Sequence, residues 1–300
     1  MTTCPACLDG FAAGDYAGLA GHFVDRAAAS DSDHIRWLNQ NLSRRKVDAA
    51  EVEERLREYL ALGPASLGAW IRRRFIARFF GESPHPFVVA LQHPSRAVLL
   101  GYVLEHHHFL RQWVRSCAYI LGRTDRDEVV EYEIDNITTE FGGWGPDRPS
   151  HYELLLRMGE ALGVPRPEIL ASPPRPATRR GVEGWARICS AKPWVSAMAA
   201  MHSLELIAHR GLVDEGAKLH YFDPAILRGD EIPAAARAFL REGYEADVGH
   251  SDRALALVER FADTPELVED AQSTFLRSVD LFDDYLMARL ERASDFEGPS

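Results

Sequence analysis

Apolar residues recur at helical spacing along most of the chain, and no segment alternates apolar and polar residues with the period of two that is typical of strands. Helix-capping residues agree with this pattern. Asp48 precedes one amphipathic segment, and Ser66 begins a second one that continues to about Phe80. The pattern therefore predicts an all-α protein with no sheet.

The same periodicity predicts the remaining helices. A central helix follows Pro94 and runs through Leu121, and the last one begins at Pro265 and runs to about Arg292. Between them we expect helices over the ranges 125–137, 150–162, 185–209 and 233–250. Frequent prolines between residues 165 and 180 indicate a surface connection. Together these segments predict a bundle of roughly seven core helices.

Composition narrows the class of protein. Of 300 residues 46% are hydrophobic, which provides ample material for a core. The 45 acidic residues exceed the 34 basic ones, and the net charge of -11 argues against nucleic acid as the main partner. No window of about 18 apolar residues is present, and the N-terminus lacks the layout of a signal peptide. We therefore expect a cytoplasmic protein with no membrane partner.

The first residues carry a candidate zinc site. We expect residues 1–45 to form a small module ahead of a bundle that spans residues 46–300. Cys4 and Cys7 form a Cys-x-x-Cys knuckle, and His22 and His34 follow on short helical segments. Two thiolates and two imidazoles complete a closed tetrahedral site, so we predict one structural Zn(II). A reduced cysteine pair without metal is the alternative, since the eleven residues between the histidines exceed the spacing of ordinary fingers.

The central helix contains the most unusual chemistry. Its segment from residue 101 to 113 places one carboxylate and three imidazoles among apolar residues, where polar groups are costly unless they are paired or bind a metal. Glu105 and His108 stand three residues apart and can reach toward one point. His106 points into the middle of the apolar face, so the helical wheel also permits it as a ligand. A core histidine held by a hydrogen bond is the alternative for each of the three.

Two later segments can complete a metal site. His202, Glu205 and His209 share one helix face, and Asp247 with His250 follows on another helix. Three helices that each direct carboxylate and imidazole ligands inward are the arrangement by which di-iron carboxylate proteins build their centres. We therefore predict that Glu105, His108, Glu205, Asp247 and His250 converge on iron. The same five residues are the candidate catalytic residues.

Several motifs resemble one family. Ser203-Leu-Glu-Leu-Ile, Ala246-Asp-Val-Gly-His and the closing Phe275-Leu-Arg-Ser-Val-Asp-Leu-Phe-Asp-Asp are similar to the corresponding segments of pyrroloquinoline quinone synthases. Asn136-x-x-x-Glu140-x-Gly-Gly followed by His151-x-Glu-Leu also resembles the heme-oxygenase-like di-iron oxidases. The chain is thus identified as similar to the heme-oxygenase-like superfamily, which includes thiaminase II. The resemblance implies a heme-oxygenase-like seven-helix bundle behind the zinc module.

The resemblance also implies the activity. Glu105-x-x-His108 looks like the first ligand pair, Glu205 like the bridging carboxylate, and Asp247 with His250 like the last ligands. Gly243 stands where the family usually has another histidine. Either Glu242, Glu245 or His209 replaces that ligand, or the second of two Fe(II) ions binds weakly, or only a mononuclear site forms; five ligands favour weak binding of the second iron. Dioxygen is the implied cosubstrate. The expected function is a non-heme di-iron oxygenase or oxidase of a small amino acid or carboxylate-bearing metabolite, in natural-product biosynthesis.

The implied reactions are amine N-oxygenation, oxidative C-C cleavage and desaturation. Arg111, Arg115 and Lys192 are candidates to hold a substrate carboxylate, with a surface role as the alternative. Two other functions stay open. One is a metal-free enzyme that resembles pyrroloquinoline quinone synthase or thiaminase II, with His108 and Glu205 as acid and base. The other is a non-enzymatic zinc-module scaffold. We expect a homodimer, a small-molecule substrate, and either an electron donor or another partner protein.

Overall fold

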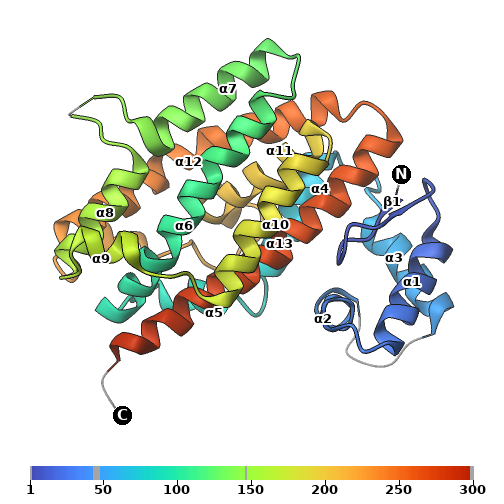
Figure 1. The fold of residues 1–300 in the computed structure, drawn as a ribbon, viewed down its shortest axis with the longest axis horizontal. Coiled ribbons are helices and arrows are strands. Elements are labelled where there is room, and N and C mark those ends of the chain that lie inside the picture. The colour runs from blue at the N-terminus through green and yellow to red at the C-terminus, as the bar shows by residue number, and fades with distance from the viewer. Residues whose placement is uncertain (1, 43–47, 146, 298–300) are drawn as a thin grey trace.

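The computed structural model describes residues 2–42, 48–145 and 147–297, apart from the side chains of residues 246–248. Helices make up most of it (Figure 1), in agreement with the predicted all-α class. The N-terminal elements are β1 (Thr2–Thr3), β2 (Gly10–Phe11), α1 (Tyr16–Ala28), α2 (Ser32–Asn41) and α3 (Ala49–Leu60). The next elements are α4 (Leu67–Phe79), α5 (Pro86–Ala90), α6 (Arg96–Leu121), α7 (Asp127–Ile137), the π-helical η1 (Thr138–Gly142) and α8 (His151–Ala161). The chain continues through α9 (Arg166–Ala171), α10 (Pro176–Ala191), α11 (Trp194–His202), and the 3-10 segments η2 (Ser203–Ala208), η3 (Arg210–Val213) and η4 (Pro224–Leu227). It ends with α12 (Ala234–Phe261), α13 (Pro265–Ala293) and η5 (Ser294–Phe296).

Local sequence sets most helix starts. Asp48, Ser66, Ser95 and Ser150 each accept a hydrogen bond from a backbone N–H in the first turn of the helix that follows. Such caps satisfy amide donors that have no partner within the helix. The predicted starts of α3, α4, α6 and α8 are therefore confirmed.

The core forms where α6, α10 and α13 lie side by side in the middle of the bundle (Figure 1). Phe109 of α6 stacks on Tyr285 of α13, with ring centroids 5.1 Å apart, and meets Trp185 of α10 edge-on. Gly101 allows the backbones of α6 and α13 to approach, since a Cβ there would overlap the carbonyl oxygen of Arg289. The close packing places α6 side chains against those of α13.

Two local predictions are wrong. The proline-rich stretch expected to be a connection contains α9 and the start of α10, because proline at the first helical positions removes only an N–H that lacks an intrahelical partner anyway. A small antiparallel pair, β1 with β2, also exists, although no sheet was expected. Its two-residue strands are too short to produce a detectable alternation.

The N-terminal module packs against one end of the bundle, beside α13 (Figure 1). The hydroxyls of Thr2 and Thr3 donate to Glu269 and Asp270 at 2.6 and 3.0 Å, and Arg36 pairs with Asp284 at 2.6 Å. Helix α3 packs with this module through contacts such as Tyr59 against Trp37 of α2. The domain boundary at residue 45 stays a prediction. Among the described residues, no helix has the length and apolar character needed to cross a membrane.

Candidate metal centres and active-site cavity

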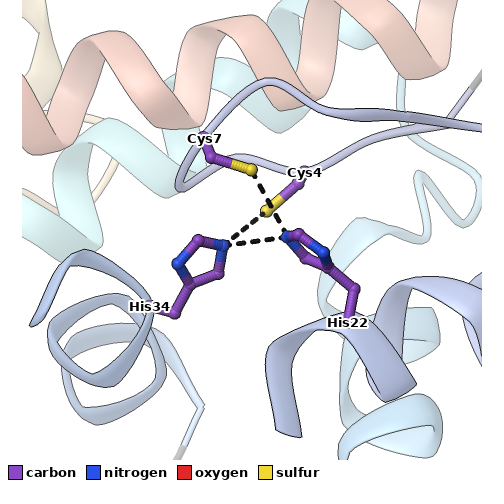
Figure 2. A group of neighbouring side chains, drawn as sticks. All are labelled: Cys4, Cys7, His22 and His34. Carbon is purple, nitrogen blue, oxygen red and sulfur yellow. Dashed lines mark hydrogen bonds between the residues drawn. The ribbon is translucent and has the colours of Figure 1, made fainter. Parts of the chain in front are cut away.

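The four predicted zinc ligands point toward one another (Figure 2). Cys4 Sγ lies 3.6 Å from His34 Nε2, Cys7 Sγ lies 3.3 Å from His22 Nε2, and the two Nε2 atoms are 2.9 Å apart. All four donor atoms lie within 4.8 Å of one another. In a tetrahedral zinc site, neighbouring N and S ligands stand roughly 3.3 to 3.8 Å apart. The donor set and the two sulfur–nitrogen distances therefore suit zinc, and the imidazoles need to separate by only about 0.4 Å.

Supporting contacts orient these ligands. Asp31 Oδ1 lies 2.8 Å from Nδ1 of His34, so the carboxylate accepts a hydrogen bond from the Nδ1–H group. The other ring nitrogen, Nε2, is then unprotonated and available for a metal. The hydrogen bond with Cys4 lowers the pKa of the Cys7 thiol to about 5, while burial raises the pKa of Cys4. The β1–β2 turn thus presents one thiolate readily, as a metal ligand requires.

A second candidate site is a cavity of about 80 Å³ inside the bundle. It is enclosed by α6, η1, α8, η2, α12 and α13. Much of the wall is aromatic. The ionisable and imidazole side chains that line it are His106, Glu140, His151, Glu205 and Arg289. A buried cavity with an apolar wall and a few converging polar groups is the usual form of a small-molecule site.

Glu205 is the predicted site residue that faces this cavity. The η2 segment follows α11 as a 3-10 turn, in which side chains three residues apart lie over each other, and it places Glu205 Oε1 3.6 Å from His202 Nδ1. Asn136 Nδ2 donates to Glu205 at 3.0 Å, and Tyr132 OH donates at 3.5 Å. The carboxylate is therefore held from three sides.

A buried ion pair lies directly behind Glu205. His202 Nε2 is 2.8 Å from Glu133 Oε1, and both side chains are almost fully enclosed. Burial alone lowers the pKa of His202, but the Glu133 carboxylate outweighs it and raises that pKa to about 10. Burial raises the pKa of Glu205, whereas the His202 hydrogen bond and charge outweigh it and lower that pKa. His202 is thus an imidazolium between two carboxylates, and Glu205 is ionised at neutral pH.

Cys117 of α6 also approaches this pair, and its thiol lies within 4.8 Å of donor atoms of Glu133 and His202. Burial raises the pKa of this thiol, and Cys117 Sγ donates a weak hydrogen bond to Asn136 at 3.4 Å. A protonated thiol beside an imidazolium is a packing contact, because neither group is then a metal ligand.

Glu140 and His151 form a second carboxylate–imidazole pair on the cavity wall. Glu140 belongs to the π-helical η1, and His151 begins α8, with Glu140 Oε1 2.9 Å from His151 Nδ1. Gly143 adopts a φ of 74°, which a side chain rarely tolerates, and it lets the connection return to Ser150. The glycine turn therefore brings residues eleven positions apart into contact across the cavity wall.

The predicted pair Glu105 and His108 lies elsewhere. Glu105 is fully buried, accepts from Arg292 Nε at 2.7 Å and accepts from the backbone N–H of Arg175 at 3.1 Å. His108 Nε2 is 3.0 Å from the carbonyl oxygen of Ser172, and burial lowers the pKa of this histidine to about 4. Neither side chain lines the cavity. The structure does not place these two residues at the cavity that Glu205 lines, and the five-residue convergence on iron stays a prediction.

His106, the alternative on the same helix, does line the cavity. Its Nδ1 lies 2.9 Å from a guanidinium nitrogen of Arg289 and 2.7 Å from Tyr285 OH. A guanidinium only donates, so Nδ1 is the acceptor and the ring proton is on Nε2. Burial and the Arg289 charge also lower the pKa of His106. The only ring lone pair of this neutral tautomer is on Nδ1 and already accepts a hydrogen bond. His106 is therefore part of the cavity wall and does not offer a ligand atom to a metal in the cavity.

The last predicted ligands lie on α12. The side chain of Asp247 is outside the described part of the chain. His250 Nε2 is 3.9 Å from Asp135, and the buried Nδ1 has no hydrogen-bond partner among the described residues. The charge of His250 contributes to the lowered pKa of Glu205, which indicates that the two are near. Gly243 lines the cavity, at the position where the resemblance implies a missing histidine.

None of the other candidates for that position, Glu242, Glu245 and His209, lines the cavity, and neither do the candidates for substrate binding. His209 lies 3.2 Å from Asp252 and accepts from the N–H of Gly211, so it is held outside the cavity. Arg111 and Arg115 are exposed, and Lys192 pairs with Asp270 at 2.8 Å. Sequence reasoning did not assign roles to Glu140, His151 and Arg289. The Asn136-to-His151 motif carried a signal for the first two, whereas Arg289 had none.

Comparison with solved structures defines the class of this bundle. A domain of unknown function with a heme oxygenase-like fold from Shewanella denitrificans is 15% identical, covers 85% of this chain and 97% of its own, and superposes with a TM-score of 0.59. A TenA homologue from Pyrococcus horikoshii is 13% identical, with coverages of 80% and 98% and a TM-score of 0.55. A TenA homologue from Pseudomonas syringae is 15% identical, with coverages of 80% and 92% and a TM-score of 0.54. At such identities the likeness establishes the fold alone, a heme-oxygenase-like bundle.

The family follows from the sequence models. The chain belongs to the TENA/THI-4/PQQC family, whose model matches residues 70–293. A C2H2 type zinc-finger model matches residues 1–61 in one copy, which together with the ligand cluster supports zinc at the N-terminus. No curated protein matches the chain. The predicted resemblance and fold class are therefore confirmed, and membership of this family supports an enzymatic role in general.

Proposed function

We propose that this chain is a non-heme iron-dependent oxidoreductase, and that Glu140, His151 and Glu205 on the cavity wall, with Asp247 and His250 of α12, would hold its iron. The observation that carries the proposal is that two carboxylates and an imidazole line one buried cavity. Carboxylate and imidazole donors suit ferrous iron. His250 adds a buried ring nitrogen without a protein partner among the described residues.

Bound there, ferrous iron would supply the activation of dioxygen. The chain's own residues have separate tasks. His202 keeps Glu205 ionised, and Asn136 with Tyr132 holds that carboxylate in one orientation. Aromatic side chains such as Phe109 and Phe282 keep water out of the cavity. A second iron binds more weakly in this proposal, because Gly243 supplies no side-chain ligand.

The test is metal analysis with matched variants. The anaerobic protein is loaded with ferrous iron, desalted and analysed for iron and zinc separately, and oxygen consumption is then followed with candidate amino acids. We expect at least one iron per chain beside the zinc, and a Glu205→Gln variant that loses most of the iron and keeps the zinc. His108→Ala is the matched control, since it removes a histidine outside the cavity and should retain the iron. Equal iron loss in both variants would overturn the ligand assignment.

A metal-free acid–base enzyme is the second candidate. The observation in its favour is that Glu205 lines the cavity, accepts a hydrogen bond from Asn136 and has a pKa that His202 keeps low, so an ionised carboxylate is available as a general base. His108 is not available as the acid partner, so the Glu140–His151 pair takes that role in this version. Two results together would favour this candidate. The parent would retain less than about a tenth of an equivalent of iron after loading, and the Glu205→Gln variant would lose turnover.

A further inference from the structure

The cavity contains a cation that no carboxylate among the described side chains neutralises. Arg289 of α13 lines the cavity and is 1% exposed. Its guanidinium donates to Tyr221 OH at 2.6 Å, to Tyr285 OH at 2.5 Å and to His106 Nδ1 at 2.9 Å. No carboxylate of a described side chain lies within 4.0 Å of it, and its Nε has no hydrogen-bond partner there.

The groups around Arg289 are neutral. Burial raises the pKa of the Tyr285 phenol, so that hydroxyl stays protonated at neutral pH. The rings of Tyr102 and Phe87 cover the guanidinium, whose central carbon is 4.0 and 5.0 Å from their centroids. Cation–π contacts and neutral hydrogen bonds offset only part of the cost of removing a full charge from water.

Two other enclosed arginines of the chain have acidic partners. Arg78 reaches both Asp280 and Asp283, at 3.0 and 2.6 Å, and Arg292 reaches Glu105 at 2.7 Å. Both are 13% exposed at the side chain, so they are less enclosed than Arg289 and still have acidic partners. A buried guanidinium that faces a cavity and lacks such a partner is typical of an anion-binding site.

We propose that Arg289 binds the carboxylate of a monocarboxylate substrate. This inference rests on the proposed function only in taking the cavity as the substrate site. A single negative charge is favoured because Arg289 is the sole lysine or arginine among the described lining residues, and a phosphate dianion would need more. Arg289 contacts α6 at His106, whereas Glu205 is tied to α6 through Asn136 and Trp113. His106 and Trp113 are about 10 Å apart along the helix axis.

A monocarboxylate with an alkyl chain of a few carbon atoms can therefore place its carboxylate at Arg289 and its far end toward Glu205. Arg289 is therefore a specificity-determining residue that selects an acid and orients its far end toward the carboxylates and His151. The exposed Arg111 and Arg115 do not take this role.

The test uses hexanoate as the probe and 1-hexanol as its neutral counterpart, with the iron-free, zinc-loaded full chain, by isothermal titration calorimetry. We expect the parent to bind hexanoate at least about tenfold more tightly than hexanol, and Arg289→Met to lose that preference, since a charged hydrogen bond is removed. Arg115→Met, an exposed arginine on α6, is the matched control and should keep it. Arg289→Met should melt no lower than the parent, because replacing an uncompensated buried charge with an apolar side chain is neutral or stabilising.

Two results would overturn the inference. One is that the parent binds hexanoate and hexanol equally, a measurement that stands even if Arg289→Met fails to fold. The other is that Arg289→Met binds hexanoate as the parent does. Because no iron is present, the outcome is separate from the iron test. An iron-binding parent without a preference for the acid defeats this inference alone, and an iron-free parent that prefers the acid defeats only the iron proposal.

Discussion

Replacement of His202 is the most direct test of the electrostatics around Glu205. In His202→Gln the cation between Glu133 and Glu205 is lost, although a side chain of similar volume remains. Glu133 is then buried without a charged partner, and Glu205 keeps Asn136, Tyr132 and the charge of His250. Removal of one partner from a buried ion pair costs about 3–5 kcal/mol. We expect the free energy of unfolding to fall by that amount.

The measurement is urea unfolding of the iron-free protein followed by circular dichroism, in a double-mutant cycle with Glu133→Gln. If the pair acts as described, the double variant is less destabilised than the sum of the two singles, by about 1–3 kcal/mol. Losses that simply add, or a His202→Gln variant within about 1 kcal/mol of the parent, would refute the reasoning.

The pH dependence of the free energy of unfolding tests the same ion pair independently. The folded pKa of His202, about 10, lies above the ordinary value of 6.5. The stabilisation by its charge is therefore complete below pH 6.5 and is lost as the pH rises through 10. Between these values the parent should lose about 1.4 kcal/mol of unfolding free energy per pH unit from this group. His202→Gln should lack that slope, and an identical slope in both proteins would contradict the assignment of the charge to His202.

Two further predictions concern the zinc module and the contact between α6 and α13. The double change Cys4→Ala, Cys7→Ala should remove the single zinc measured by metal analysis, whereas Cys189→Ala, a buried cysteine of α10, should retain it; unchanged zinc in the double variant would disprove the site. Gly101→Ala should lower the free energy of unfolding by about 2 kcal/mol or more, because its Cβ would overlap the backbone of Arg289. Gly21→Ala in α1 is the control, because a Cβ there meets nothing within 4 Å. It should be neutral or stabilising by up to about 1 kcal/mol in the same urea assay. Equal effects at both glycines would argue against the close approach of α6 and α13.

Helix positions were predictable because their signals are local. Ser95 caps α6 and Gly122 ends it, and the structure places that helix at Arg96–Leu121. The zinc ligands were predictable for a similar reason, since all four lie within the first 34 residues. The β1–β2 pair was missed because two-residue strands are defined by the knuckle turn and not by periodicity.

The orientation of α6 could not be predicted by the same means. Most of this helix is buried on all sides, so an apolar stripe does not identify the face that meets the cavity. Neighbouring positions on a helix point about 100° apart. A shift of one residue therefore exchanges Glu105 for His106, and only the packing of α13 decides between them. The cavity receives Tyr102, His106, Phe109 and Trp113.

From the sequence alone, Glu105 is predicted as an iron ligand because no partner for this buried carboxylate is nearby in the chain. Its partner, Arg292, lies 187 residues later in the chain, where the sequence alone does not associate the two. Arg289 is the opposite case: it meets His106 across 183 residues, and no carboxylate of a described side chain pairs with it. Whether a buried charge indicates a ligand-binding site is thus decided by long-range packing, because only the folded chain reveals which charges are already compensated. By that criterion Glu105 is a structural residue, whereas Arg289 is the charge that still needs a partner.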